Sequence, residues 1–219
     1  MKMKLAKFID HTLLKADASI EAIKKLCAEA KQYDFKSVCV NTCNIELCKK
    51  ELEGSDVLTC CVIGFPLGAM STEAKVFETE DAIKKGADEV DMVINIGRLK
   101  DGCLDYCTDE IKKIKKACGD KTLKVIIETC LLSDDEIVKA CHCVLDGGAD
   151  FVKTSTGFST AGATFEGVAL MKKTVGDKCK IKAAGGVRSH EDMLKMIELG
   201  ANRIGTSSGT KLISIGEEL

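Results

Sequence analysis

Two lysines lie inside stretches of the sequence that otherwise have the pattern of buried strands. Lys153 occurs in the segment 150–156 and Lys182 in the segment 180–184. An unpaired lysine is costly to bury, so buried lysines are typical of functional sites. When two ammonium groups lie close together, one of them tends to lose its proton, and a neutral amine attacks carbonyl carbons. The pair therefore predicts imine chemistry at one of these two lysines.

Asp91, in the apolar segment 89–95, adds a carboxylate to this pair. Beside a lysine, it would keep that ammonium group charged and exchange protons with it. A purely structural explanation is a buried ion pair between Asp91 and one lysine, which leaves the second lysine unexplained. Among the lysines, we expect only Lys153 and Lys182 to lie inside the barrel that these strands form.

The elements that must position these residues repeat along the chain. Short segments rich in Val, Ile and Cys alternate with longer amphipathic segments rich in Lys and Glu, which predicts buried strands and surface helices. Eight such units without a linker favour an α/β chain with one domain, 1–219, folded as a (β/α)8 TIM barrel and not as an open doubly wound sheet. The expected strands are 8–12, 37–41, 58–65, 89–95, 123–129, 150–156, 180–184 and 203–206.

A barrel of this kind has its active site at the carboxyl ends of its strands. The polar residues that we expect there are Asp10, Asn41, Asp91, Asn95, Glu128, Lys153, Thr156 and Lys182. The last two strands lead into glycine-rich turns that suit a phosphate group, through backbone N–H groups and hydroxyls; these residues are Gly185, Gly186, Gly205, Ser207 and Ser208. We expect Arg188 and Arg203 to be solvated at the surface.

Composition excludes several classes of function. A net charge of −2 gives no support for binding nucleic acid or an anionic membrane. The start of the chain lacks the apolar region of a signal peptide, so we expect a cytoplasmic protein. The thirteen cysteines are interpreted as free thiols that fill the core of a protein from a reducing compartment. Cys141, His142 and Cys143 would point in different directions on a helix, so we expect no metal site there.

The chain resembles deoxyribose-phosphate aldolase, a class I aldolase, over nearly its whole length. The matching segments are 9–14, 62–68, 89–97, 124–129, 151–158, 182–188 and 203–208. The resemblance implies reversible cleavage of 2-deoxy-D-ribose 5-phosphate to D-glyceraldehyde 3-phosphate and acetaldehyde, without a cofactor or metal, in the breakdown of deoxynucleosides. It implies that Lys153 forms the Schiff base and that Lys182 and Asp91 donate and accept protons, with Lys182 perturbing Lys153. The residues expected to bind substrate are Asp10, Asn41, Thr156, Gly185, Gly186, Gly205, Ser207 and Ser208.

The sequence departs from the family pattern in places and leaves alternatives open. Ala16 and Thr42 replace prolines in two loops, and the chain ends at Leu219 without the tyrosine that assists proton transfer in some members. A water between Lys182 and Asp91 is one substitute for that tyrosine. Another lysine-dependent aldolase or transaldolase-like barrel, acting on a different phosphorylated sugar, is the alternative enzyme. A phosphate-binding or metal-buffering protein is the non-enzymatic alternative. A homodimer and a homotetramer both stay open.

Overall fold

Every apolar segment identified above contains a strand, and the strands pair in parallel and in sequence order. The last strand pairs with the first, which closes the barrel. The computed structural model describes residues 4–219. The strands are β1 (Ile9–Leu13), β2 (Ser37–Asn41), β3 (Leu58–Ile63), β4 (Glu89–Val93), β5 (Thr122–Ile126), β6 (Phe151–Lys153), β7 (Lys180–Ala184) and β8 (Arg203–Thr206). The predicted (β/α)8 barrel is therefore confirmed.

The strand boundaries differ from the prediction mainly at one end. β2, β7 and β8 match it, whereas β3, β4, β5 and β6 end two or more residues early. The chain leaves the sheet at these points to form the loops at the carboxyl end of the barrel. β6 has three residues because Thr154–Thr156, predicted as strand, already belong to the loop that follows Lys153.

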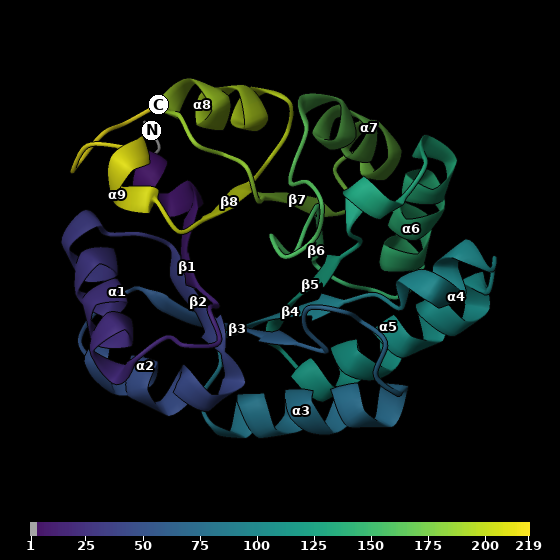
Figure 1. Ribbon diagram of the computed structural model, residues 1–219, viewed down its shortest axis with the longest axis horizontal. Helices are drawn as coiled ribbons and strands as arrows, with labels where there is room; N and C mark the ends of the chain where they lie inside the picture. Colours follow the sequence, from purple (N-terminus) through teal and green to yellow (C-terminus); the bar gives the residue numbers. More distant parts are fainter. Residues whose placement is uncertain (1–3) are drawn as a thin grey trace.

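Helices surround the barrel on all sides (Figure 1). They are α1 (Ile20–Tyr33), α2 (Ile45–Glu51), α3 (Thr72–Lys84), α4 (Ile96–Lys100), α5 (Leu104–Cys118), α6 (Asp134–Asp146), α7 (Phe165–Val175), α8 (His190–Glu198) and α9 (Gly209–Leu212), with 3-10 turns at Leu5–Phe8, Thr42–Asn44 and Thr129–Leu131. Ser133 begins α6 with a reciprocal capping box to Glu136. Within residues 4–219, no helix is both long and apolar enough to cross a membrane.

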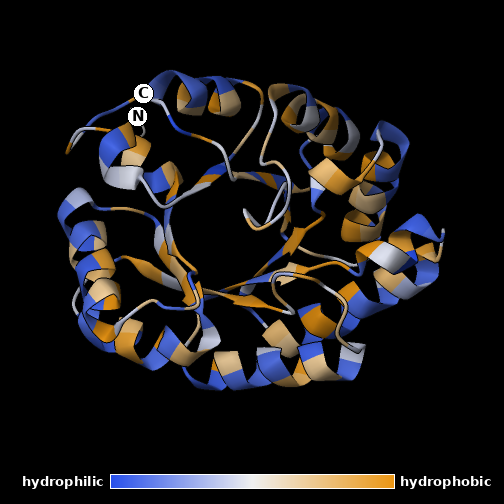
Figure 2. Ribbon diagram, viewed as in Figure 1, coloured by the Kyte–Doolittle hydropathy of each residue, from blue (hydrophilic) through white to orange (hydrophobic). Residues whose placement is uncertain are grey.

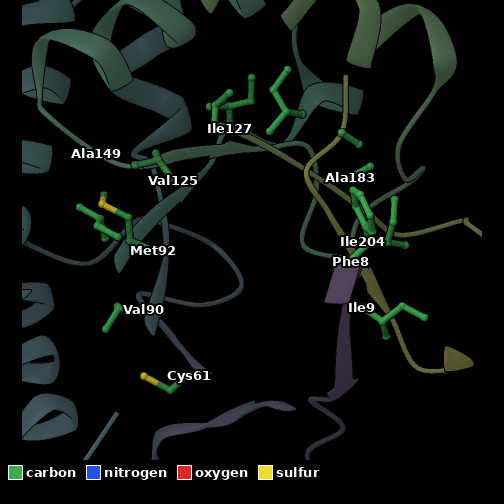
Figure 3. Close-up of a cluster of buried hydrophobic side chains, with 14 of the residues drawn as sticks. Phe8, Ile9, Cys61, Val90, Met92, Val125, Ile127, Ala149, Ala183 and Ile204 are labelled. Atoms are coloured by element: carbon green, nitrogen blue, oxygen red, sulfur yellow. The ribbon is translucent and has the colours of Figure 1, made fainter. Parts of the chain in front are cut away.

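The main apolar core lies between the barrel and the helices. Alternation along each strand sends one set of side chains outward: in β4, Val90 and Met92 are fully buried in this layer (Figure 3). The helices turn their apolar faces toward it and their hydrophilic faces outward (Figure 2). The thirteen cysteines are all free, and most are buried. The opposite set of strand side chains fills the barrel interior, and there the sequence places charges.

Candidate active site

Charged side chains occupy the middle of the barrel. Strand alternation directs them inward, so that residues far apart in sequence meet around one axis. Seven of them are at most 5% exposed: Asp10, Glu89, Asp91, Lys124, Lys153, Lys182 and Arg203. They form a single network of ion pairs, which we call the interior charge cluster.

Asp91 is the centre of this cluster. Its Oδ2 lies 2.8 Å from Nζ of Lys153 and 2.7 Å from Nζ of Lys182. Its Oδ1 lies 2.9 Å from Nζ of Lys124 and accepts a hydrogen bond of 3.1 Å from the thiol of Cys60. One carboxylate thus holds three lysines, as register predicts, because β6 and β7 pair Lys153 directly with Lys182.

A second layer of ion pairs lies below. Lys182 Nζ is 2.6 Å from Oδ2 of Asp10, whose Oδ1 accepts a hydrogen bond of 2.6 Å from Arg203 Nε. Arg203 also donates two hydrogen bonds to Glu89, whose Oε2 lies 2.6 Å from Lys124 Nζ. Each cation of this layer therefore contacts two carboxylates.

Counting these charges singles out Lys153. The cluster holds three carboxylates and four basic groups, so it carries one excess positive charge when every group is ionised. Lys124, Lys182 and Arg203 each have two carboxylate partners, whereas Lys153 shares one oxygen of Asp91 with Lys182. Lys153 is therefore the cation of the cluster with the fewest carboxylate contacts.

The electrostatics of its neighbours agree with this distribution of charge. Burial by itself would lower the pKa of Lys182, but the carboxylates of Asp10 and Asp91 outweigh burial and raise it. Burial is likewise outweighed at Asp91, whose pKa is held well below its usual range by Lys124, Lys153 and Lys182. The pKa of Lys124 is raised, chiefly by Asp91 acting against burial. Lys182 and Lys124 thus stay charged at neutral pH, and Asp91 stays ionised.

A cavity of about 600 Å³ opens above the cluster. Lys153 is the member of the cluster that lines it, and its side chain is 3% exposed, while Lys124 and Lys182 are fully buried. The loop after β6, green in Figure 1, lies across the barrel opening in that view. Thr156 and Phe158 of this loop line the same cavity. Lys153 therefore adjoins a cavity that is large enough for a small substrate.

The glycine-rich turns form another part of the cavity wall. All five residues predicted for phosphate line it, together with Arg188: Gly185, Gly186, Gly205, Ser207 and Ser208. Gly185 and Gly186 have φ values of 75° and 80°, a backbone conformation that favours glycine. A Cβ on Gly205 would lie 3.0 Å from Cε of Lys182, so this glycine also makes room for the lysine. The Ser208 N–H already donates to Thr206 Oγ1, which leaves the Ser208 hydroxyl for a ligand.

The remaining predicted substrate contacts are divided. Thr156 lines the cavity, and its backbone N–H and hydroxyl both donate to the buried carboxylate of Glu128. Asp10 is fully buried beneath Lys182 and does not line the cavity, so the geometry gives it an indirect role through that lysine. Asn41 also lies outside the cavity wall, where its Nδ2 donates to the carbonyl oxygen of Leu14 at 3.3 Å.

Two expectations about the barrel interior were wrong. Arg203, expected at the surface, is 5% exposed, because β8 turns its side chain inward to Asp10 and Glu89. The barrel interior holds a third lysine beside Lys153 and Lys182, because Lys124 is also fully buried there. The charged atoms of Lys182 and Asp91 are in direct contact at 2.7 Å, which leaves no space between them for the water considered above as a substitute for the tyrosine.

Two groups bear on metal binding. Cys141 and Cys143 are buried while His142 between them is exposed, so these three residues do not converge. Within residues 4–219, one group has the geometry of a metal site: Cys39, Cys60 and Asp91, whose ligand atoms lie within 4.8 Å of one another. Burial raises the pKa of the Cys60 thiol well above its usual value, and Asp91 already binds three lysines. A cation there would face the excess positive charge of the cluster, so we assign no metal to it.

Comparison with known proteins gives a consistent result. A deoxyribose-phosphate aldolase of Finegoldia magna is 61% identical over 96% of this chain and 99% of its own length. One from Malacoplasma penetrans is 60% identical over 96% of this chain and 95% of its own. Among solved structures, the tetrameric deoxyribose phosphate aldolase of Aeropyrum pernix superposes with a TM-score of 0.87 at 31% identity, covering 95% of this chain and 88% of that one.

A further solved structure and a family sequence profile also match this chain. An aldolase named QR15 superposes with a TM-score of 0.92 at 40% identity, over 95% of this chain and 93% of its own. The profile that describes DeoC/LacD family aldolases matches residues 4–213, almost the whole chain. The buried lysines, the cavity above them and these similarities agree, and the chain belongs to the DeoC/LacD family of aldolases.

Proposed function

We propose that this protein is a class I aldolase that reversibly cleaves 2-deoxy-D-ribose 5-phosphate to D-glyceraldehyde 3-phosphate and acetaldehyde, in the breakdown of deoxyribose phosphate. The observation that carries the proposal is the position of Lys153. It is the cation of the interior charge cluster with a single carboxylate contact, and it is the one that lines the cavity. A lysine held partly neutral beside a charged lysine is a nucleophile toward an aldehyde.

The proposed reaction begins when the neutral Lys153 amine attacks C1 of the open-chain sugar. Loss of water gives an iminium ion at C1, next to C2, so that the C2–C3 bond can break toward it. The C3 hydroxyl then loses its proton, C3 becomes the aldehyde carbon of glyceraldehyde 3-phosphate, and the electron pair of the C2–C3 bond moves toward the iminium to form an enamine. Protonation of the enamine at C2, followed by hydrolysis, releases acetaldehyde and regenerates Lys153.

Lys182 and Asp91 are proposed to supply and remove the protons of these steps. Asp91 Oδ2 lies 2.8 Å from Nζ of Lys153 and 2.7 Å from Nζ of Lys182, so a proton has a short path among the three groups. Asp91 bridges the two lysines through one oxygen, which couples the protonation of each lysine to the other. The iminium serves as the electron sink, so the proposed mechanism requires no metal ion.

The 5-phosphate is proposed to bind at the turns after β7 and β8. The backbone N–H groups at Gly185 and Gly186, with the hydroxyls of Ser207 and Ser208, suit an anion, and Arg188 adds positive charge to the same cavity. Thr156 lines the same cavity, where it is placed to contact the sugar.

The proposal extends to the setting of the protein. The many free cysteines suit the reducing cytoplasm. By similarity to the tetrameric enzyme of Aeropyrum pernix, we propose a homodimer or homotetramer, with a small phosphorylated sugar as the substrate.

The test is reductive trapping. The protein is incubated with acetaldehyde and borohydride, and the modified peptide is mapped. We expect label on Lys153 in the wild type and none in Lys153→Ala, which should also lose essentially all turnover. Label on Lys182 with Lys153 unmodified would overturn the assignment. Cleavage rates for 2-deoxyribose 5-phosphate, compared with those for other phosphorylated sugars, test the substrate separately from the imine chemistry.

A further inference from the structure

Glu128 is held in an unusual backbone conformation next to the cavity. It follows β5 with φ 56° and ψ 64°, the left-handed region, which is unfavourable by about 1–3 kcal/mol for residues other than glycine. Glycine would adopt this conformation freely, but it would lack the carboxylate. The Glu128 side chain is therefore the feature that the strained position provides.

The backbone around Glu128 fixes where that carboxylate points. Ile127 N–H donates to the carbonyl oxygen of Lys153 at 3.0 Å, and Thr129 N–H donates to that of Thr154 at 2.9 Å. These bonds tie the residues that follow β5 to the last residue of β6 and to the residue after it. Between them, the left-handed turn directs the Glu128 side chain to the next part of the loop, at Thr156.

The carboxylate of Glu128 is buried, and its hydrogen bonds come from neutral groups. It is 2% exposed and accepts from the Thr156 backbone N–H at 3.1 Å, from the Thr156 hydroxyl, and weakly from the Cys130 thiol. Within residues 4–219, no ion pair involves Glu128, so it stands apart from the interior charge cluster. A buried carboxylate that binds a hydroxyl in this way orients its proton.

The hydrogen bonds of the Thr156 hydroxyl leave one free position. Its proton is directed to Glu128, and Oγ1 accepts a hydrogen bond of 3.0 Å from the N–H of Phe158. A hydroxyl oxygen has two lone pairs, so one remains. Thr156 lines the cavity, and its hydroxyl therefore offers a ligand an acceptor and no donor. Polarisation by the negative charge of Glu128 makes this a stronger acceptor than an isolated hydroxyl.

We infer that Glu128 is a positioning residue that makes Thr156 an obligate hydrogen-bond acceptor, and that the site thereby selects a sugar with a proton-donating hydroxyl facing Thr156. This inference rests on the proposed function, because it assumes a sugar bound as an imine to Lys153. The candidate donors on 2-deoxyribose 5-phosphate are the C3 and C4 hydroxyls. A group that can accept but not donate, placed at the same carbon, would oppose the lone pair of Thr156.

The experiment compares three substituents at one carbon. The probes are 2-deoxyribose 5-phosphate and its analogues with hydrogen or fluorine in place of the C3 or the C4 hydroxyl. The readout is the probe concentration that gives half-maximal borohydride trapping on Lys153, because the C3 analogues form an imine but cannot be cleaved. At the carbon that faces Thr156, we expect the wild type to bind the hydroxyl about tenfold or more tightly than hydrogen, and fluorine more weakly still.

Glu128→Gln should reverse this polarity. The amide oxygen would accept the Thr156 N–H, and the amide NH2 would donate to Thr156 Oγ1, so that the hydroxyl proton turns toward the cavity. Fluorine should then bind as well as hydrogen or better, and the advantage of the hydroxyl should shrink. A structural role alone would weaken all three probes equally. The inference would be overturned if Glu128→Gln bound the three probes in the same order of affinity as the wild type. It would also be overturned if the wild type bound all three substituents equally at both C3 and C4.

Variants of Thr156 provide the matched controls and do not alter Glu128. Thr156→Ser should keep the wild-type order, whereas Thr156→Val should remove both the preference for hydroxyl and the penalty for fluorine. If that preference and penalty persist in Thr156→Val, the inference fails even when Glu128→Gln does not fold. Trapping of acetaldehyde on wild-type Lys153 is measured in parallel. Its absence would show that the proposed function has failed, whereas trapping without the reversed order would refute only the role of Glu128.

Discussion

Removing the charge of Lys182 should shift the pH at which Lys153 becomes reactive. Both ammonium nitrogens lie against the same oxygen of Asp91, at 2.8 and 2.7 Å, so they are at most about 5.5 Å apart. At an effective dielectric constant of about 20, two unit charges at this distance repel by about 3 kcal/mol, which corresponds to about two pH units. In Lys182→Leu this repulsion is absent, and Asp91 has one fewer cation to stabilise it. Both changes favour the charged form of Lys153.

The assay is the initial rate of reductive trapping of acetaldehyde across a pH series. In Lys182→Leu, the midpoint of the profile should move upward by about two pH units, and trapping at neutral pH should fall by up to about a hundredfold. Lys182→Arg keeps the positive charge and serves as the matched control, with a midpoint close to that of the wild type even if the rate falls. Identical midpoints in wild type and Lys182→Leu would refute the reasoning, because Lys182 would then have no influence on the charge of Lys153.

Four further predictions test other parts of the structure. Gly186→Val should raise KM for 2-deoxyribose 5-phosphate more than it lowers kcat, and unphosphorylated 2-deoxyribose should be a much poorer substrate; equal efficiency on both sugars would mean that the turn binds no phosphate. Dialysis against a chelator should leave turnover unchanged, and restoration of lost turnover by a divalent ion would contradict the imine mechanism. Arg203→Met leaves Asp10 and Glu89 without their shared cation and should lower the free energy of unfolding by about 3–5 kcal/mol, as measured by denaturant titration. Neighbouring cations, chiefly Arg203 for Asp10 and Lys124 for Asp91, outweigh burial and hold the pKa values of these two carboxyl groups below their usual range. The stability that the two groups contribute should therefore be complete above about pH 4 and decline as the pH falls further. Asp91→Asn should flatten part of this decline in acid-unfolding curves.

The sequence predicted the barrel because its strands are buried on both faces and separated by amphipathic helices. Alternation also predicted that Lys153 and Lys182 share the interior, and register on neighbouring strands brings them together at Asp91. The ends of the strands were less predictable. Segments such as Thr154–Thr156 are apolar or small and buried, so their composition resembles a strand although the backbone has already left the sheet.

Three members of the interior charge cluster, Glu89, Lys124 and Arg203, were missed for a definite reason. Active sites of these barrels lie at the carboxyl ends of strands, so Glu89 and Lys124 were not considered as interior charges and Arg203 was expected at the surface. A signal was nevertheless present. Glu89 lies two residues before Asp91 and must share its face, and Lys124 belongs to the next strand, paired directly with Asp91. Arg203 begins β8, where sequence alone does not distinguish a solvated arginine from one turned inward.

These lower charges affect the proposed chemistry above them because all seven groups belong to one network of ion pairs. Asp10 and Glu89 together neutralise Arg203 and half of the charge of Lys124 and of Lys182. Without them, Asp91 would have to neutralise more than one cation, and Lys153 would be one of several amines able to release a proton. With two carboxylates given to each deeper cation, the single excess charge is confined to the lysine that faces the cavity. The same ion pairs that hold the strands of the barrel together therefore leave Lys153, the proposed nucleophile, as the lysine with the fewest carboxylate contacts.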